Sequence, residues 1–169
     1  MCSECLPQYS ARSTGGSRQQ SAKAQRGLCM PLKILIVDDS SEIRQLLRFF
    51  IEHNTDWLVC GEAENGQVAV EKVTETTPHA VILDLSMPVM NGLDAAREIT
   101  RIAPNVQIVM FTMHVSEQLR QDAKDAGIKD LISKSDKIGD HLLASLRTIC
   151  AQAFPHPEPS QNSVNRPHP

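Results

Sequence analysis

Five side chains stand where short apolar runs of this sequence end, so folding could bring them together to do chemistry. They are Asp38, Asp39, Asp84, Thr112 and Lys134. The run before Asp84, residues 80–83, is apolar throughout, which is typical of a strand buried on both faces of a parallel sheet. Parallel strands end at one edge of their sheet, and open α/β sheets build their sites there. The five residues therefore predict a site where three carboxylates, a hydroxyl and an ammonium group converge.

Three close carboxylates favour a bound divalent cation and phosphoryl transfer. Carboxylates raise each other's pKa unless positive charge compensates them. Mg²⁺ takes oxygen ligands and keeps several waters, and the backbone carbonyl of Ser86 is a further candidate ligand. Lys134 can pair with a phosphoryl oxygen, and Thr112 can donate a hydrogen bond to the same group. Asp84 can act as the nucleophile and form an acyl phosphate, because this reaction asks the protein mainly for alignment and positive charge.

The surrounding sequence alternates strands and helices that can position these residues. Strands are predicted at residues 34–37, 57–60, 80–83, 106–111 and 130–133. Helices are predicted from Ser40 or Ser41, over residues 66–76, near residues 93–103, from Ser116 to Ala126 with Gly127 as the C-cap, and from Asp136. This alternation predicts an α/β fold, a doubly wound parallel sheet in a single domain with right-handed crossovers. No G-x-G-x-x-G follows the first strand and no P-loop motif occurs, so a dinucleotide-binding fold is not indicated and a P-loop is excluded.

The first predicted helix should bury one apolar stripe against this sheet. Its members are Ile43, Leu46, Leu47, Phe50 and Ile51.

Composition changes at both ends of the chain. Residues 1–30 are rich in Ser, Gln, Arg and Gly without hydrophobic periodicity, which predicts a disordered extension, and Met30 is an alternative start. Residues 152–169 form a proline-rich tail that we also expect to be disordered. The folded domain should span residues 31–151. Cys2 and Cys5 have zinc-ligand spacing but lack a second pair, so reduced thiols are the better interpretation.

Charge and hydropathy restrict the class of partner. The chain has 169 residues and a net charge of −3; residues 1–30 carry +3 and residues 155–169 carry none, so the segment between them carries −6. This acidic core argues against nucleic acid as its direct ligand. No apolar run is long enough to span a membrane and no signal peptide is evident, so we expect a cytoplasmic protein without membrane contact.

The order and spacing of these residues resemble the receiver domain of two-component response regulators. The resemblance covers about residues 32–151 and adds Met87-Pro88 and Gly92 to the five site residues. It implies a flavodoxin-like (βα)5 fold with strand order 2-1-3-4-5. It also implies that Asp84 accepts a phosphoryl group from a sensor histidine kinase, a phosphotransfer protein or a small phosphodonor. Mg²⁺, or Mn²⁺ in its place, would be bound by Asp38, Asp39 and Asp84.

Two positions depart from the family pattern. Leu131 occupies the place of an aromatic residue that swings inward on activation, so the expected switch consists of Thr112 and Leu131. Ser135 replaces a proline that often follows the lysine, and we expect the Lys134–Ser135 bond to be trans. Ser86 and His114 lie near the mouth of the predicted site and are candidate modulators of its chemistry, although His114 could also be a solvated loop residue.

Phrases such as Met113-His114 resemble the branch that usually carries a helix-turn-helix output domain. The 19 residues after Cys150 leave no room for one, which predicts a stand-alone receiver: a signalling protein rather than an enzyme, acting through a protein partner or a phosphorelay, with a homodimer as a further expectation. One alternative is a fragment of a DNA-binding response regulator. Another is a Mg²⁺-dependent phosphatase of the haloacid dehalogenase type, although Asp84-Leu85-Ser86 lacks the second Asp of that family's motif.

Overall fold

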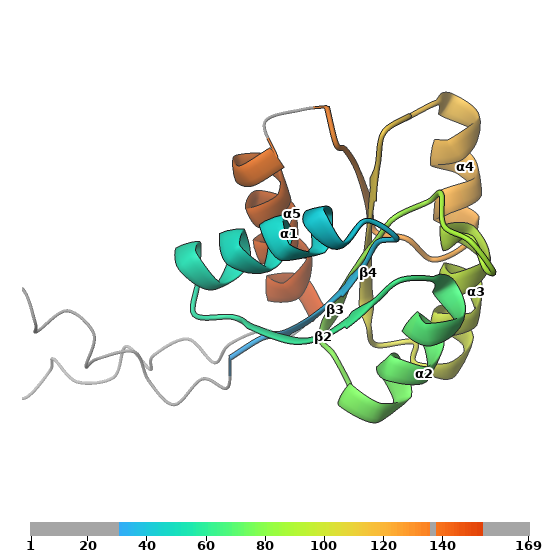
Figure 1. Cartoon of the computed structure of the whole chain (residues 1–169). Coiled ribbons are helices and arrows are strands. Elements are labelled where there is room, and N and C mark those ends of the chain that lie inside the picture. The colour runs from blue at the N-terminus through green and yellow to red at the C-terminus, as the bar shows by residue number, and fades with distance from the viewer. Residues whose placement is uncertain (1–30, 136–137, 154–169) are drawn as a thin grey trace, which may run out of the picture.

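Five parallel strands alternate with five helices in the computed structural model, which describes residues 31–135 and 138–153 (Figure 1). The strands are β1 (Lys33–Val37), β2 (Leu58–Ala63), β3 (Ala80–Leu83), β4 (Gln107–Thr112) and β5 (Asp130–Ser133). The helices are α1 (Ser41–Asn54), α2 (Gly66–Thr76), α3 (Gly92–Ile102), α4 (Glu117–Asp125) and α5 (Ile138–Ala153). The sheet order is β2-β1-β3-β4-β5, so the predicted flavodoxin-like fold is confirmed.

Helices cover both faces of the sheet, α1 and α5 on one side and α2, α3 and α4 on the other (Figure 1). Alternate residues of each strand supply the two hydrophobic clusters, since successive strand side chains point to opposite faces. In β1, Leu35 and Val37 face α2, α3 and α4, whereas Ile34 and Ile36 face α1 and α5. All four are buried, as expected for an apolar run in an interior strand that helices cover on both faces.

Side chains cap the first four helices. Ser40 accepts from Ile43 N–H at the start of α1, which confirms a cap at Ser40 or Ser41. Ser116, where a helix was predicted to begin, accepts from Leu119 N–H and caps α4. Asn65 and Asn91 cap α2 and α3 in the same way, and neither cap was predicted. Gly127 follows α4 with φ +83°, the left-handed conformation that glycine adopts at the end of a helix.

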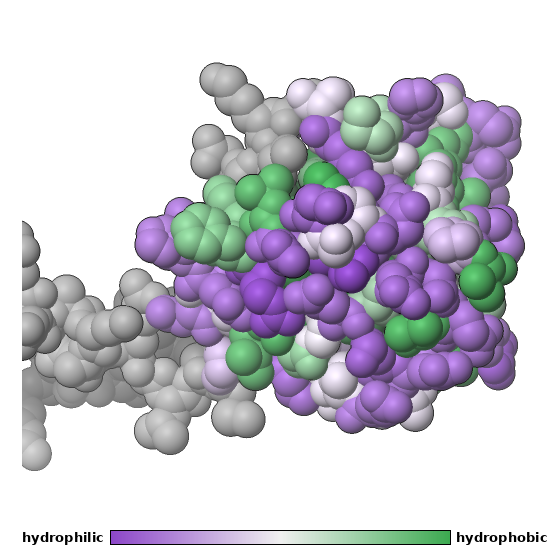
Figure 2. Space-filling model, viewed as in Figure 1, coloured by the Kyte–Doolittle hydropathy of each residue, from purple (hydrophilic) through white to green (hydrophobic). Residues whose placement is uncertain are grey.

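Two predictions about these elements are wrong in detail. The second strand runs to Ala63 rather than residue 60, because Gly61 and Glu62 interrupt the apolar pattern although both pair with β1. The side chain of Leu46 is 48% exposed, since Leu47 and Ile51 occupy the part of α1 that faces the sheet. Together with Phe49, which is 66% exposed, Leu46 leaves apolar surface on α1, where Figure 2 shows green among the mainly hydrophilic atoms.

Several other predictions concern the ends of the domain. The described residues contain no cis peptide bond, in agreement with a trans Lys134–Ser135 bond. Helix α5 extends to Ala153, two residues into the predicted tail. The predicted disorder of residues 1–30 and 154–169, the Cys2–Cys5 pair and the Asp136 cap lie outside the described residues. No described helix is long and apolar enough to cross a membrane.

Candidate functional site

Three carboxylates converge at the carboxyl ends of β1 and β3. Asp38, Asp39 and Asp84 each place a carboxylate oxygen within 4.8 Å of the others. Asp38 and Asp84 are buried, whereas Asp39 is exposed. An all-oxygen donor set with one exposed member fits a hard cation that keeps part of its water shell. These residues could therefore hold Mg²⁺ or Mn²⁺.

Lys134 connects the two buried carboxylates. Its Nζ lies 2.6 Å from Asp38 Oδ2 and 2.9 Å from Asp84 Oδ1. The turn after β5 brings it there, and its backbone N–H donates to the carbonyl of Thr112 at 2.8 Å. The ammonium also lies 5.7 Å from the centre of the Phe111 ring, within the range of a cation–π interaction. Lys134 thus supplies a positive charge where a phosphoryl group on Asp84 would need one.

Backbone groups complete the contacts of the buried carboxylates. Asp38 Oδ1 accepts from Ser40 N–H at 3.0 Å, and Asp84 Oδ2 accepts from Ser86 N–H at 3.1 Å. The main chain of Asp84 donates to the Val37 carbonyl at 2.9 Å, which ties β3 to β1 at this edge. Each buried carboxylate therefore has one oxygen bound to the lysine and the other to a loop N–H.

Burial raises the pKa of Asp84 above its ordinary value, and the nearby charge of Asp38 adds to this effect. The hydrogen bond and the positive charge of Lys134 lower it only in part. For Lys134, burial alone would lower the pKa, but the hydrogen bonds and charges of both carboxylates outweigh burial and raise it. The lysine consequently stays an ammonium group between two acids.

Thr112 lies at the same edge, 2% exposed at the end of β4. Its Oγ1 is 3.5 Å from the N–H of His114, a long hydrogen bond, and the His114 side chain is exposed. Leu131 lies elsewhere: it is half-buried in β5 and packs on the sheet face covered by α2, α3 and α4. The structure thus places Thr112 at the edge of the sheet that carries the carboxylates, and Leu131 on the sheet face covered by α2, α3 and α4.

The loop between β3 and α3 turns sharply beside Asp84. Val89 has φ +66°, and the N–H of Met90 donates to the Pro88 carbonyl at 2.7 Å across it, which closes a three-residue γ-turn. The loop returns to the strand through Gly92, whose N–H donates to the Leu85 carbonyl at 2.9 Å. Glycine fits position 92 because a Cβ there would overlap the backbone oxygen of Asp84.

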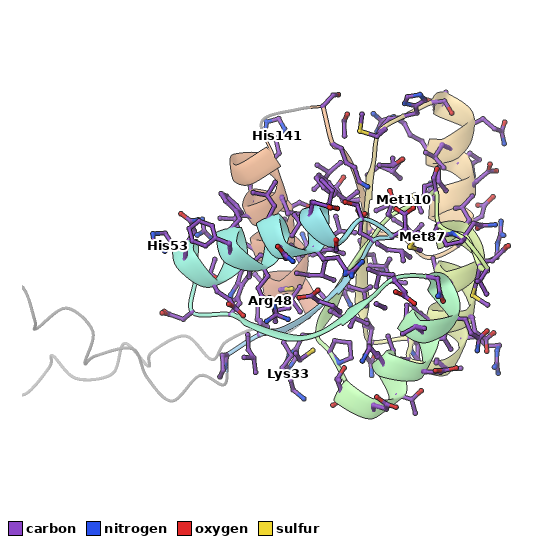
Figure 3. The ribbon with its side chains drawn as sticks, in the orientation of Figure 1. Lys33, Arg48, His53, Met87, Met110 and His141 are labelled. Carbon is purple, nitrogen blue, oxygen red and sulfur yellow. The ribbon has the colours of Figure 1, made fainter. Side chains whose placement is uncertain are left out.

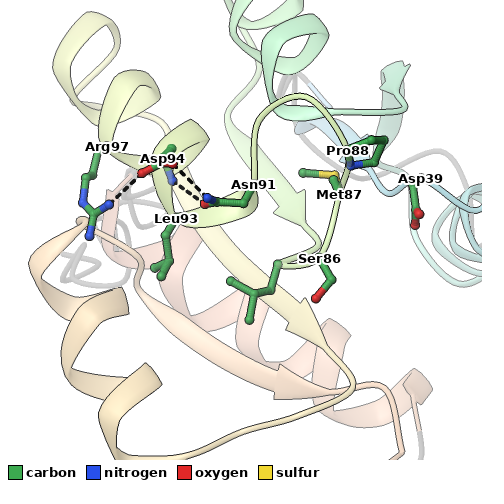
Figure 4. Close-up of a pocket in the computed structure, with 9 residues that line it drawn as sticks. Asp39, Ser86, Met87, Pro88, Asn91, Leu93, Asp94 and Arg97 are labelled. Atoms are coloured by element: carbon green, nitrogen blue, oxygen red, sulfur yellow. Dashed lines mark hydrogen bonds and ion pairs between the residues drawn. The ribbon is translucent and has the colours of Figure 1, made fainter.

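A pocket of about 580 Å³ opens next to Asp39, between this loop and α3 (Figure 4). Ser86 and Met87 form part of its wall, and Arg97 lies on the far side, paired with Asp94 at 2.8 Å. The site edge is therefore open to solvent, with room beside Asp39 for an incoming group.

One contact in this region was not predicted. The guanidinium of Arg44, in the first turns of α1, donates to the backbone carbonyl of Asp38 at 2.7 Å. A charged residue on an amphipathic helix usually indicates a solvated face, so nothing in the sequence distinguished Arg44 from the other charged residues of α1.

The family model for the response regulator receiver domain matches residues 34–146. The chain belongs to the response regulator receiver domain family. As a receiver domain it is a part of two-component signalling, and receiver domains are signalling proteins that interact with histidine kinases and phosphotransfer proteins.

Relatives of this receiver domain include both short and long proteins. It is 41% identical over 105 residues to the chemotaxis protein CheY of Thermotoga maritima, covering 62% of this chain and 87% of that protein. It is 32% identical over 111 residues to the response regulator protein VraR of Staphylococcus saprophyticus, covering 66% of this chain but only 53% of VraR. The chain thus spans about half the length of this second relative.

Among solved structures, the receiver domain resembles a chain of the CheX–CheY–BeF3–Mg²⁺ complex from Borrelia burgdorferi. The TM-score is 0.67 at 26% identity, with 71% of this chain and 90% of that chain covered.

Proposed function

We propose that Asp84 accepts a phosphoryl group from a histidine kinase, a phosphotransfer protein or a small phosphodonor in a reaction that requires Mg²⁺ or Mn²⁺. One observation carries this proposal: the buried Asp84 carboxylate lies in contact with an ammonium group and within 4.8 Å of two further acids. A nucleophile, a cation site and a charge for the transferred group are thus adjacent, as phosphoryl transfer requires.

In this reaction a carboxylate oxygen of Asp84 attacks phosphorus and forms an acyl phosphate. The bond from phosphorus to the donor's leaving atom breaks, and that atom, an imidazole nitrogen in the case of phosphohistidine, keeps the electron pair. Lys134 pairs with a phosphoryl oxygen, and the Thr112 hydroxyl donates a hydrogen bond to the same group. Both residues act electrostatically.

Asp38, Asp39, Asp84 and the backbone carbonyl of Ser86 would hold the cation. When bound, it neutralises negative charge on the phosphoryl oxygens. The Borrelia relative supports this assignment, since it was solved with Mg²⁺ and a beryllium fluoride group.

The phosphorylated domain would signal through a protein partner or pass the group onward in a phosphorelay. Exposed Leu46 and Phe49 on α1 support a protein contact, because α1 begins directly after Asp39 at the site edge. Thr112 would respond to phosphorylation most directly, since it lies at the site edge. Leu131 would take part in this switch as an aliphatic side chain packed against the hydrophobic cluster under α2, α3 and α4. Ser86 and His114 would influence the access of water and phosphodonors to Asp84.

Acetyl phosphate with Mg²⁺ tests the proposal directly. We expect intact-mass measurement to show one added phosphoryl group on the wild type, and none on Asp84→Asn or after chelation of the metal. Asp94→Asn is the matched control, because it removes an exposed carboxylate of the neighbouring pocket, and it should be labelled at the wild-type rate.

An unlabelled wild type, or unchanged labelling of Asp84→Asn, would refute the proposal. Release of many equivalents of phosphate from varied monoesters would instead favour a phosphatase of the haloacid dehalogenase type.

A further inference from the structure

Arg44 forms hydrogen bonds to the backbone of the acidic loop after β1. Its Nη1 donates to the backbone carbonyl of Asp38 at 2.7 Å and, with a longer contact of 3.3 Å, to that of Asp39. Its side chain is only 16% exposed. The guanidinium therefore satisfies the carbonyls of the two residues whose carboxylates face the candidate cation site.

Glu62, near the end of β2, holds this guanidinium in place. Glu62 Oε2 lies 3.2 Å from Arg44 Nε, and Glu62 Oε1 lies 2.6 Å from Nε of Arg48, one turn later on α1. Figure 3 shows Arg48 directed from α1 toward β2. Both arginines thus share one carboxylate, but the bonds to the Asp38 and Asp39 carbonyls come from Arg44.

We propose that Arg44, held by Glu62, is a positioning residue that fixes the backbone of Asp38 and Asp39 so that their carboxylates stay together at the cation site. The proposal rests on the function proposed above. A planar guanidinium with several donors suits this role, because it can bond the two carbonyls and Glu62 in one fixed geometry. Partners that orient metal ligands typically change metal affinity by roughly 10–100-fold when they are removed.

The sign of the effect separates positioning from simple electrostatics. A positive charge near a cation site repels the cation, so if charge alone mattered, removing Arg44 would tighten Mg²⁺ binding. If Arg44 orders the ligands, its removal allows the Asp38–Asp39 loop to move, and Mg²⁺ binding weakens. The two accounts predict opposite changes in the same measurement.

The test compares Arg44→Met with Arg48→Met. Each variant loses an ion pair with Glu62, and Arg48→Met also loses an exposed one with Glu52, but only Arg44→Met loses bonds to the Asp38 and Asp39 carbonyls. We expect calorimetric titration to show Mg²⁺ affinity reduced about tenfold or more in Arg44→Met, and changed by less than about twofold in Arg48→Met. At saturating Mg²⁺, labelling of Arg44→Met by acetyl phosphate should recover toward the wild-type rate, since Arg44 does not touch the phosphoryl group.

Glu62→Gln provides a second variant that keeps the guanidinium and loosens its anchor. It should weaken Mg²⁺ binding in the same direction as Arg44→Met but less, and urea unfolding without metal confirms that each variant is folded. Unchanged or tighter Mg²⁺ binding in Arg44→Met, or an equal loss in Arg48→Met, would overturn the inference. Failure of the wild type to bind Mg²⁺ or to be labelled would refute the proposed function instead.

Discussion

Replacing Gly92, the first residue of α3, with alanine should displace the backbone of Asp84. A Cβ built on Gly92 lies 2.1 Å from the backbone oxygen of Asp84 and 2.9 Å from the Cα of Leu85. These contacts are with backbone, so no side-chain rotation relieves them. To reach even 3.0 Å, the Asp84 carbonyl and the start of α3 must separate by about 0.9 Å.

The size of the effect follows from this displacement. Overpacking that forces a backbone shift costs about 1–3 kcal/mol. Gly92 is the first residue of α3, so the preference of helix interiors for alanine does not offset this cost, and we expect a loss of roughly 1–3 kcal/mol in the free energy of unfolding. A misplacement of about 1 Å at a reacting group can reduce the rate about 100-fold. Labelling by acetyl phosphate should therefore fall much more than stability.

Two measurements on Gly92→Ala check this reasoning: the free energy of unfolding from urea titration and the rate of labelling at saturating Mg²⁺. Gly61→Ala in β2 is the control, because its Cβ would meet the flexible end of the Leu35 side chain at 3.2 Å and not the backbone of Asp84. We expect Gly61→Ala to be labelled at the wild-type rate. Labelling of Gly92→Ala at that same rate would refute the argument.

Three further predictions concern strain, charge and pH. Val89→Gly should raise the free energy of unfolding by about 1 kcal/mol in urea titrations, since a β-branched residue at φ +66° is strained; no gain would contradict this. Lys134→Met should tighten Mg²⁺ binding about tenfold in calorimetry, because it frees Asp38 Oδ2 from an ammonium group, while it slows labelling; weaker binding would contradict this. Burial, and then the charge of Lys33, lower the pKa of His79, whose Nδ1 accepts from a backbone N–H. The folded state therefore binds fewer protons at His79 than the unfolded state does. The stabilisation from neutral His79 is present above about pH 6.5 and is lost as the pH falls below it. Urea titrations at about pH 7.5 and about pH 5.5 should show a smaller loss of unfolding free energy in His79→Gln than in the wild type.

The sequence predicted the sheet because burial leaves a clear pattern in it. Residues 34–37 and 80–83 are apolar on both faces, as central parallel strands must be, and their ends carry the acids. Strand β2 lies at the edge of the sheet, and its second half was not predicted because Gly61 and Glu62 interrupt the apolar run. Edge strands are partly exposed, so they tolerate polar residues that a pattern analysis takes for a loop.

The sequence predicted the side chains of the site better than the contacts that support them. Carboxylates, a lysine and a threonine at strand ends have few other uses in combination, which is why they could be named in advance. The caps by Asn65 and Asn91, the γ-turn at Val89 and the bonds of Arg44 to the Asp38 and Asp39 carbonyls each span six residues or fewer. The two caps left a signal that was overlooked, since asparagine is a preferred N-cap residue. Valine is unusual in a left-handed turn and arginine is common on helices, so the residue types alone did not indicate the other two contacts.

The charges at the site edge explain why three carboxylates there call for both a lysine and a cation site. When ionised, Asp38, Asp39 and Asp84 carry three negative charges, and Lys134, which contacts two of them, compensates one. A phosphoryl group would bring further negative charge to a site that is already negative and partly buried, where like charges repel more strongly than in water. A divalent cation would remove this excess, and Lys134 would then be available to the incoming oxygens. The same balance accounts for the raised pKa of Asp84, because a buried carboxylate next to another acid is stable as an anion only as far as positive charge reaches it.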